Sequence, residues 1–135
     1  MTAGKGHSMS VDGIVVSVMA GNRGNGVSVL KVSGYLDTNT ASELESAIYQ
    51  LLNKNEFKIV VDLSGVTYIS SAGWGIFIGE IKDIRINGGD LKLSGMIGDV
   101  YEVFQLLEFN TILEAYDKAD EAVAAFASTG RTEAG

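Results

Sequence analysis

Residues Phe57–Ser64, with the sequence FKIVVDLS, are the segment that most restricts the possible fold. Apolar side chains occupy both alternations of this run: Phe57, Ile59, Val60, Val61 and Leu63. Successive side chains of an extended chain point to opposite faces of a sheet, so both faces of this strand need to be covered. The segment is therefore predicted to be a central strand of a parallel sheet.

The rest of the chain alternates between strand-like and helix-like segments. Strands are predicted at 14–20, 27–34, 57–64, 90–94 and 111–115, and helices at about 40–54, 71–87, 99–109 and 118–127. Residues 21–25, GNRGN, are predicted to form a hairpin loop between the first two strands. The order ββαβαβαβα predicts an α/β fold with a mixed, mostly parallel sheet, an N-terminal antiparallel strand and about four helices.

A single domain is expected from the length of the chain. Its 135 residues suffice for one hydrophobic core and are too few for two. Residues 1–12 and 128–135 are small and polar and show no periodicity, so both are predicted to be flexible tails. The folded domain is expected to span residues 13–127.

Polar residues mark the starts of two predicted helices. Thr40 and Glu43 have the spacing of a capping box, in which both side chains bond backbone amides at the helix N-terminus. Ser71 is the second of two serines that follow the apolar segment and is expected to be the N-cap of the next helix. A phosphoryl group on Ser71 would meet the positive end of the helix dipole, which the fold can tolerate.

Charge and composition argue against several classes of partner and site. Seventeen acidic residues against ten basic ones give a net charge of −7, which disfavours binding to nucleic acid or to anionic membrane surfaces. The chain has no cysteine, so thiolate metal ligands and thiol nucleophiles are excluded. It has neither a transmembrane-length apolar run nor the apolar core of a signal peptide. A cytoplasmic protein with no cofactor or metal of its own is expected.

Ser71 also invites comparison with the nucleophile of a serine hydrolase. The G-x-S-x-G motif is only half present, because Gly73 follows at the right spacing but Ile69 stands where the first glycine belongs. The only histidine, His7, lies near the N-terminus, and a serine nucleophile needs a base within hydrogen-bond reach. The glycines at 73–79 also miss the dinucleotide-binding pattern, because Ile78 takes the third glycine position. A serine hydrolase is a distant third alternative.

Two stretches together resemble the STAS family, which contains the anti-sigma factor antagonists. They are SGYLDTNTASEL (33–44) and VVDLSGVTYISSAGWGIFIG (60–79). The first is similar to the family's G-x-L-D segment before its first helix, and the second to its D-L-S…D-S-S-G-x-G strand, turn and helix. The similarity continues through residues 87–95 and 100–123, and the fold implied is the α/β order derived above.

The resemblance implies roles for particular residues of the second stretch. The family's phosphorylated serine falls on Ser71, with Ala72, Gly73 and Gly75 at the positions that follow, and Asp37 matches the aspartate beside the phosphosite. Two positions depart from the family pattern. Ser70 replaces the aspartate that precedes the phosphorylated serine and is an alternative acceptor, and Trp74 replaces a leucine. The expected partner-binding residues are Asp37, Ser70, Ala72, Gly73, Trp74 and Gly75.

The function implied by the resemblance is that of a non-enzymatic signalling module. It would bind an anti-sigma factor or a related switch serine kinase, and phosphorylation of Ser71 would switch it off. A serine phosphatase would restore the unmodified state. The alternative is a STAS interaction module that does not switch, such as a scaffold in a stress complex or an accessory subunit of a lipid-transport ATPase. The sequence leaves the oligomeric state open.

Overall fold

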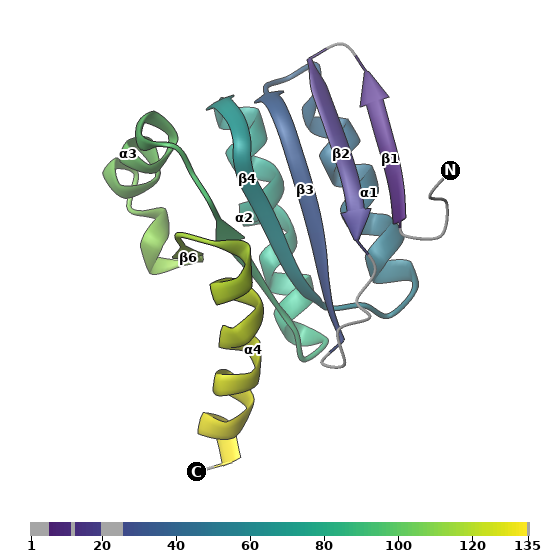
Figure 1. The fold of residues 1–135 in the computed structure, drawn as a ribbon, viewed down its shortest axis with the longest axis vertical. Helices are drawn as coiled ribbons and strands as arrows, with labels where there is room; N and C mark the ends of the chain where they lie inside the picture. Colours follow the sequence, from purple (N-terminus) through teal and green to yellow (C-terminus); the bar gives the residue numbers. More distant parts are fainter. Residues whose placement is uncertain (1–5, 12, 20–25, 135) are drawn as a thin grey trace.

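The computed structural model describes residues 6–11, 13–19 and 26–134, which form a six-stranded sheet with helices on both faces (Figure 1). The strands are β1 (Gly6–Val11), β2 (Ile14–Met19), β3 (Val27–Leu36), β4 (Lys58–Ile69), β5 (Asp90–Ser94) and β6 (Glu114–Tyr116). The helices are α1 (Ala41–Asn53), α2 (Ser71–Ile86), α3 (Gly98–Leu106), the short 3-10 helix η1 (Phe109–Thr111) and α4 (Ala119–Ala134).

The sheet is mixed, as the sequence predicts. Its strands lie in chain order from β1 to β6. β2 is antiparallel to both of its neighbours, β1 and β3, and the strands from β3 to β6 are parallel. The predicted order ββαβαβαβα and the α/β class are confirmed from Ile14 onward. The hairpin loop predicted at residues 21–25 lies outside the described residues.

The predicted N-terminal tail is wrong for residues 6–11, which form β1. This strand pairs with β2 from Gly6↔Met19 to Val11↔Ile14, so only residues 12 and 13 connect the two strands. The sequence of that connection is Asp-Gly, a pair typical of two-residue hairpins, and Gly13 has a φ of 98°. An edge strand is held largely by backbone hydrogen bonds, so the polar composition of this segment did not reveal it.

The predicted C-terminal tail is wrong for most of its length, because α4 continues to Ala134. The prediction ended the helix at residue 127, where the sequence turns to serine, threonine and glycine. A glycine in a helix interior costs only about 1 kcal/mol, and proline, the strong helix breaker, is absent from the chain. Weak local propensity therefore did not end the helix.

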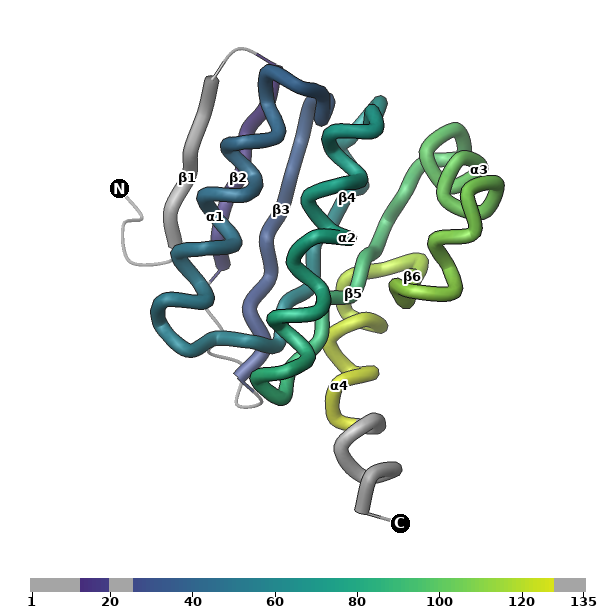
Figure 2. The backbone as a smooth tube through the Cα atoms, turned by 180° about the vertical axis from the view of Figure 1, so that it is seen from behind, coloured from purple at the N-terminus to yellow at the C-terminus, as the bar shows by residue number. Residues whose placement is uncertain are grey.

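The central strand β4 is covered on both faces, as its apolar pattern requires. Ile59, Val61 and Leu63 belong to the larger core cluster with α1 and α2, which lie together on one side of the sheet (Figure 2). Val60 belongs to a smaller cluster on the other face, together with Phe126 of α4. Among the described residues, no helix is both long enough and apolar enough to cross a membrane.

A buried lysine lies beneath α4. The side chain of Lys92 on β5 is 1% exposed, and its Nζ lies 2.7 Å from Glu114 Oε1 and 3.3 Å from Asp90 Oδ2. The same Nζ lies 4.8 Å from the centroid of the Phe126 ring. A buried ammonium group is tolerated when carboxylates and an aromatic face compensate its lost hydration. Lys92 therefore links β5 to β6 through its ion pair with Glu114, and β5 to α4 through its contact with the Phe126 ring.

The pH dependence of stability should report this interaction. The hydrogen bond from Lys92, together with that from Tyr116, lowers the pKa of the Glu114 carboxyl in the folded state. A lowered folded-state pKa contributes stability above the unfolded pKa, and this contribution disappears as pH falls through the folded-state value. We expect Glu114→Gln to lower the free energy of unfolding at pH 7 more than at pH 3, measured by urea denaturation.

The matched control is Glu102→Gln, which removes an exposed carboxylate from α3. Glu102 forms no ion pair with any described residue, so this variant should follow the wild-type pH profile. An equal loss of stability for Glu114→Gln at both pH values would show that the Glu114 charge does not stabilise the fold.

Candidate functional site

The ends of β3 and β4 bring together the two segments that the sequence singles out. The strands are parallel, and their pairing ends with Leu36 opposite Ile69. The Ser70 amide then donates to the Leu36 carbonyl at 2.8 Å. The turn that starts at Asp37 therefore lies beside the start of α2, at the carboxyl edge of the sheet where α/β folds commonly place their sites.

Ser70, rather than Ser71, is the N-cap of α2. Ser70 has an extended backbone with φ −87° and ψ 178°, and its Oγ accepts a hydrogen bond from the Gly73 amide at 3.4 Å. The prediction that Ser71 caps the helix is wrong, because Ser71 is already the first helical residue. The cap is the residue that is still extended.

The consequence is that the Ser71 hydroxyl is free. Ser71 is exposed, and its side chain has no hydrogen-bond partner in the part of the chain that the structure describes. It lies at the positive end of α2, whose first turn contains no acidic residue. The site therefore combines an accessible hydroxyl with a backbone environment that tolerates negative charge.

Asp37 holds the neighbouring turn in shape. Its Oδ1 accepts hydrogen bonds from the amides of Asn39 at 2.8 Å and Thr40 at 3.1 Å. The predicted capping box of Thr40 and Glu43 is wrong, because Thr40 makes no side-chain cap to α1. The Thr40 hydroxyl is used within the turn instead, accepting from the Asp37 amide at 2.9 Å and donating to the Tyr35 carbonyl at 2.8 Å. The turn is thus fixed by its own polar groups.

The glycines of α2 divide into two kinds. A Cβ on Gly73 would lie 2.8 Å from both Ile69 Cγ2 and Leu36 Cβ, so this glycine allows α2 to pack closely on the strand ends. A Cβ on Gly75 or Gly79 would meet nothing within 4 Å. Residues four apart share one helix face, so Ser71, Gly75 and Gly79 form an exposed, nearly bare stripe.

Trp74 points away from that stripe, into the core. Trp74 is 3% exposed and packs against Phe77, Phe104 and Phe109, with ring centroids 6.1, 5.9 and 5.1 Å away. It therefore ties α2 to α3 and η1, as expected for a core residue. Ala72 is half-buried. Of the residues predicted to contact a partner, Gly75 is openly exposed, Gly73 and Trp74 are buried, and Asp37, Ser70 and Ala72 lie in between.

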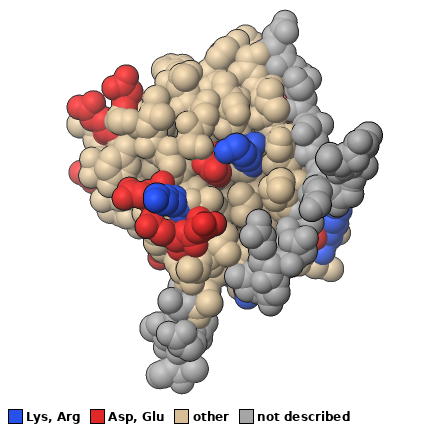
Figure 3. All heavy atoms as spheres, viewed as in Figure 1, with Lys and Arg blue, Asp and Glu red and all other residues tan. Residues whose placement is uncertain are grey.

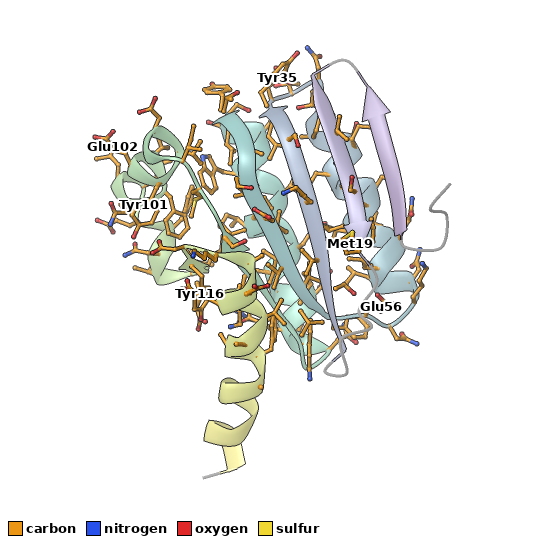
Figure 4. The ribbon with its side chains drawn as sticks, viewed as in Figure 1. Met19, Tyr35, Glu56, Tyr101, Glu102 and Tyr116 are labelled. Carbon is orange, nitrogen blue, oxygen red and sulfur yellow. The ribbon has the colours of Figure 1, made fainter. Side chains whose placement is uncertain are left out.

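Two tyrosines at the same edge were not predicted from the sequence. Tyr35 and Tyr68 are register partners at the ends of β3 and β4, and they are 39% and 56% exposed. Figure 4 shows Tyr35 at the end of the sheet where these strands finish. Strand periodicity offered a signal, since each tyrosine alternates with a buried residue, Leu36 or Ile69, on the same strand.

The ionisable groups that the structure describes near the site do not form a catalytic set. His7 lies in β1, and β2 and β3 separate it from β4. Across these strands, residue 7 pairs with residue 18, residue 18 with residue 30, and residue 30 with Val61, which precedes Ser71 by ten residues. Two intervening strands mean a separation of roughly 14 Å across the sheet, beyond hydrogen-bond reach. Among the described residues, no cluster of three or more histidine or carboxylate side chains is arranged to hold a metal.

A perturbed carboxyl group occurs further along α2. Burial raises the pKa of Glu80, while a hydrogen bond from Tyr49 of α1 opposes the shift. Glu80 lies nine residues after Ser71, which corresponds to about 13 Å along the helix. On the face viewed in Figure 3, the two groups of basic atoms nearest the middle lie beside acidic atoms. One ion pair of the sheet joins Lys31 Nζ to Asp62 Oδ2 at 3.6 Å. The described residues on that face form no basic stripe for a nucleic-acid backbone.

Comparisons with known proteins agree with this architecture. The family model described as STAS domain matches residues 21–122. The anti-sigma-B factor antagonist of Staphylococcus aureus is 32% identical over 88 residues, covering 63% of this chain and 82% of that protein. The anti-sigma-B factor antagonist of Listeria monocytogenes is 29% identical over 83 residues, covering 62% of this chain and 73% of that protein.

Solved structures show the same fold. The crystal structure of an anti-sigma factor antagonist from Mycobacterium paratuberculosis superposes with a TM-score of 0.75 at 27% identity, covering 86% of this chain and 96% of that one. The unphosphorylated anti-sigma factor antagonist SpoIIAA superposes with a TM-score of 0.70, covering 84% of this chain and 96% of that one. At 17% identity, the second likeness concerns the fold alone.

The two adjacent serines should differ in their effect on stability. Ser70→Ala removes the N-cap of α2 and should lower the free energy of unfolding by about 0.5 to 2 kcal/mol. Ser71→Ala removes an exposed hydroxyl with no partner among the described residues, so its effect should stay within about 0.5 kcal/mol. Urea denaturation of both variants measures the difference, and a larger loss for Ser71→Ala would reassign the cap.

Proposed function

The chain belongs to the STAS domain family, and from that premise we propose that it is an anti-sigma factor antagonist that is switched off by phosphorylation of Ser71. The partner would be an anti-sigma factor or a related switch serine kinase. The observation that carries the proposal is the free Ser71 hydroxyl on the first turn of α2, separate from the cap at Ser70. This arrangement lets Ser71 be modified without removing the hydrogen bond that starts the helix.

Electrostatics explains how the modification would act. A phosphoserine carries a charge of about −1.5 to −2, and the helix dipole offsets part of its cost within the domain by about 0.3 to 1 kcal/mol. The exposed stripe of Ser71, Gly75 and Gly79 would let a partner approach the α2 backbone closely before modification. A phosphoryl group on that stripe would add bulk and charge at the contact, so the partner would be released while the domain stays folded.

The domain would carry no cofactor of its own. The kinase partner would supply ATP and magnesium, and a serine phosphatase would restore Ser71. Hydrolysis by Ser71 itself is not proposed, because His7 lies across two strands from β4. We propose a cytoplasmic location, where such a kinase and phosphatase act.

The second candidate function is a STAS scaffold that binds a partner without being switched. It is favoured by Ser70, which stands where the family's aspartate precedes the phosphorylated serine. Ser70 is also the alternative phosphoacceptor. The Ser70 hydroxyl accepts the N-cap hydrogen bond from the Gly73 amide, so phosphorylation of Ser70 would disturb that bond. Phosphorylation of Ser71 would not, because the Ser71 hydroxyl takes no part in the cap.

Incubation with the cognate kinase and ATP tests the switch. We expect mass spectrometry to locate phosphate on Ser71, and we expect Ser71→Asp to remain folded but to bind the kinase at least tenfold more weakly than wild type. Ser71→Ala should bind as tightly as wild type and remain bound in the presence of ATP. Phosphate on Ser70 alone, or on neither serine, would reject the Ser71 switch and favour the scaffold.

A substitution on the bare stripe tests the contact surface independently of phosphorylation. Gly75→Gln should weaken kinase binding at least tenfold because a long side chain would occupy the stripe, while stability should rise by several tenths of a kcal/mol because glutamine favours helix. Isothermal titration calorimetry and urea denaturation measure the two effects.

The matched control is Ile86→Gln, which places the same side chain at the far end of α2, where Ile86 is 72% exposed. This variant should bind the kinase normally. Equal weakening by both variants, or none by Gly75→Gln, would remove the stripe from the interface.

A further inference from the structure

A pocket of about 180 Å³ lies next to the proposed switch, between the end of β4, the first turn of α2 and α3. Its apolar lining includes Ile69, Trp74, Val100 and Val103. An apolar cavity of about 150 Å³ is large enough to hold benzene, so this pocket can hold a side chain the size of phenylalanine.

Trp74, one of the lining residues of the pocket, carries an unsatisfied donor. Trp74 is 3% exposed, and its Nε1 is buried without a hydrogen-bond partner among the described residues. Buried indole N–H groups usually find an acceptor, so an unpaired one is unusual in a protein core. Trp74 therefore offers apolar surface to a guest in the pocket.

The rim of the pocket is open and carries one carboxylate, that of Asp99. Tyr68 is 56% exposed and Val103 is 37% exposed, so the lining reaches solvent. Asp99, also in the lining, is exposed and forms no ion pair with any described residue. The charge at the rim favours a cationic group beside the guest.

We propose that this pocket anchors a phenylalanine-sized apolar side chain of a protein partner, with a basic residue next to it in the partner's sequence pairing with Asp99. Buried aromatic side chains in such pockets commonly dominate the energy of an interface. A second copy of this chain is disfavoured as the guest, because two chains of net charge −7 repel each other. The inference rests on the proposed function in taking the guest to be the protein that docks on the Ser71 side of the domain.

Trp74 is the only tryptophan in the chain, so its indole N–H gives a single cross-peak in a ¹⁵N–¹H spectrum. We would titrate the full chain with N-acetyl-Phe-Arg-amide and follow this cross-peak. We expect a saturable shift with a dissociation constant in the millimolar range. N-acetyl-Ala-Arg-amide and N-acetyl-Phe-Glu-amide should each bind at least threefold more weakly. No shift, or equal binding of all three probes, would overturn the proposal.

Variants of the lining separate pocket binding from surface binding. Val103→Phe should fill the pocket and abolish the shift, whereas Leu106→Phe, on the same helix at a position 77% exposed, should leave it unchanged. Asp99→Asn should reduce the preference for the arginine probe over the glutamate probe to less than twofold. This exposed substitution keeps the test decisive if Val103→Phe fails to fold. Normal binding by folded Val103→Phe would refute the pocket.

The experiment is independent of the switch. Ser71→Asp should titrate with the peptide probes like wild type, so a failed phosphorylation assay leaves the pocket result intact, and an absent indole shift leaves the kinase result intact. The indole cross-peak should also be recorded at increasing protein concentration without any peptide probe. A shift under these conditions that is absent in Val103→Phe would identify a second copy as the guest and contradict the proposal.

Discussion

The two apolar faces of β4 are the constraint on which the rest of the structure depends. Ile59 and Val61 require cover from α1 and α2, while Val60 requires cover on the opposite face, which α4 supplies through Phe126. A strand buried in this way pairs on both edges with parallel neighbours, β3 and β5. Parallel pairing with β3 makes both strands finish at the same edge, and that edge is where the Asp37 turn meets the start of α2. The position of the candidate site thus follows from the burial of one strand.

The same constraint explains why a charged residue is tolerated on β5. The face covered by α4 has a small apolar cluster, because one helix covers only part of a sheet face. Lys92 lies in this layer, where its carboxylate partners and the Phe126 ring compensate for its lost hydration. The hydrogen bond to Glu114 also links β5 to the short edge strand β6, which is only three residues long. On this face of the sheet, the ion pairs and the cation–π contact of Lys92 therefore supplement a small apolar cluster.

The sequence was sufficient wherever one physical requirement dominated. The strand and helix order followed from apolar periodicity, and Ser71 was found at the start of α2 because a polar residue interrupts an apolar run. The cap was misassigned because Ser70 and Ser71 are chemically identical, and only the backbone angles at Ser70 decide which hydroxyl reaches the Gly73 amide. The pocket could not be predicted, because it depends on how Trp74 packs against Phe104 and Phe109, which are distant in sequence.

The separation of the cap from the exposed hydroxyl matters for any switch built at this turn. Were Ser71 the N-cap, a phosphoryl group on it would replace the hydroxyl that starts α2, and modification would alter helix stability together with binding. With the cap at Ser70, the Ser71 side chain can change its charge while the hydrogen bond to the Gly73 amide persists. Gly73 lies close to the ends of both strands, since a Cβ at this position would be 2.8 Å from Ile69 Cγ2 and from Leu36 Cβ. The start of α2 is therefore anchored by backbone and packing that Ser71 does not share, so the effect of a charge on Ser71 is directed outward, to whatever lies against the exposed stripe.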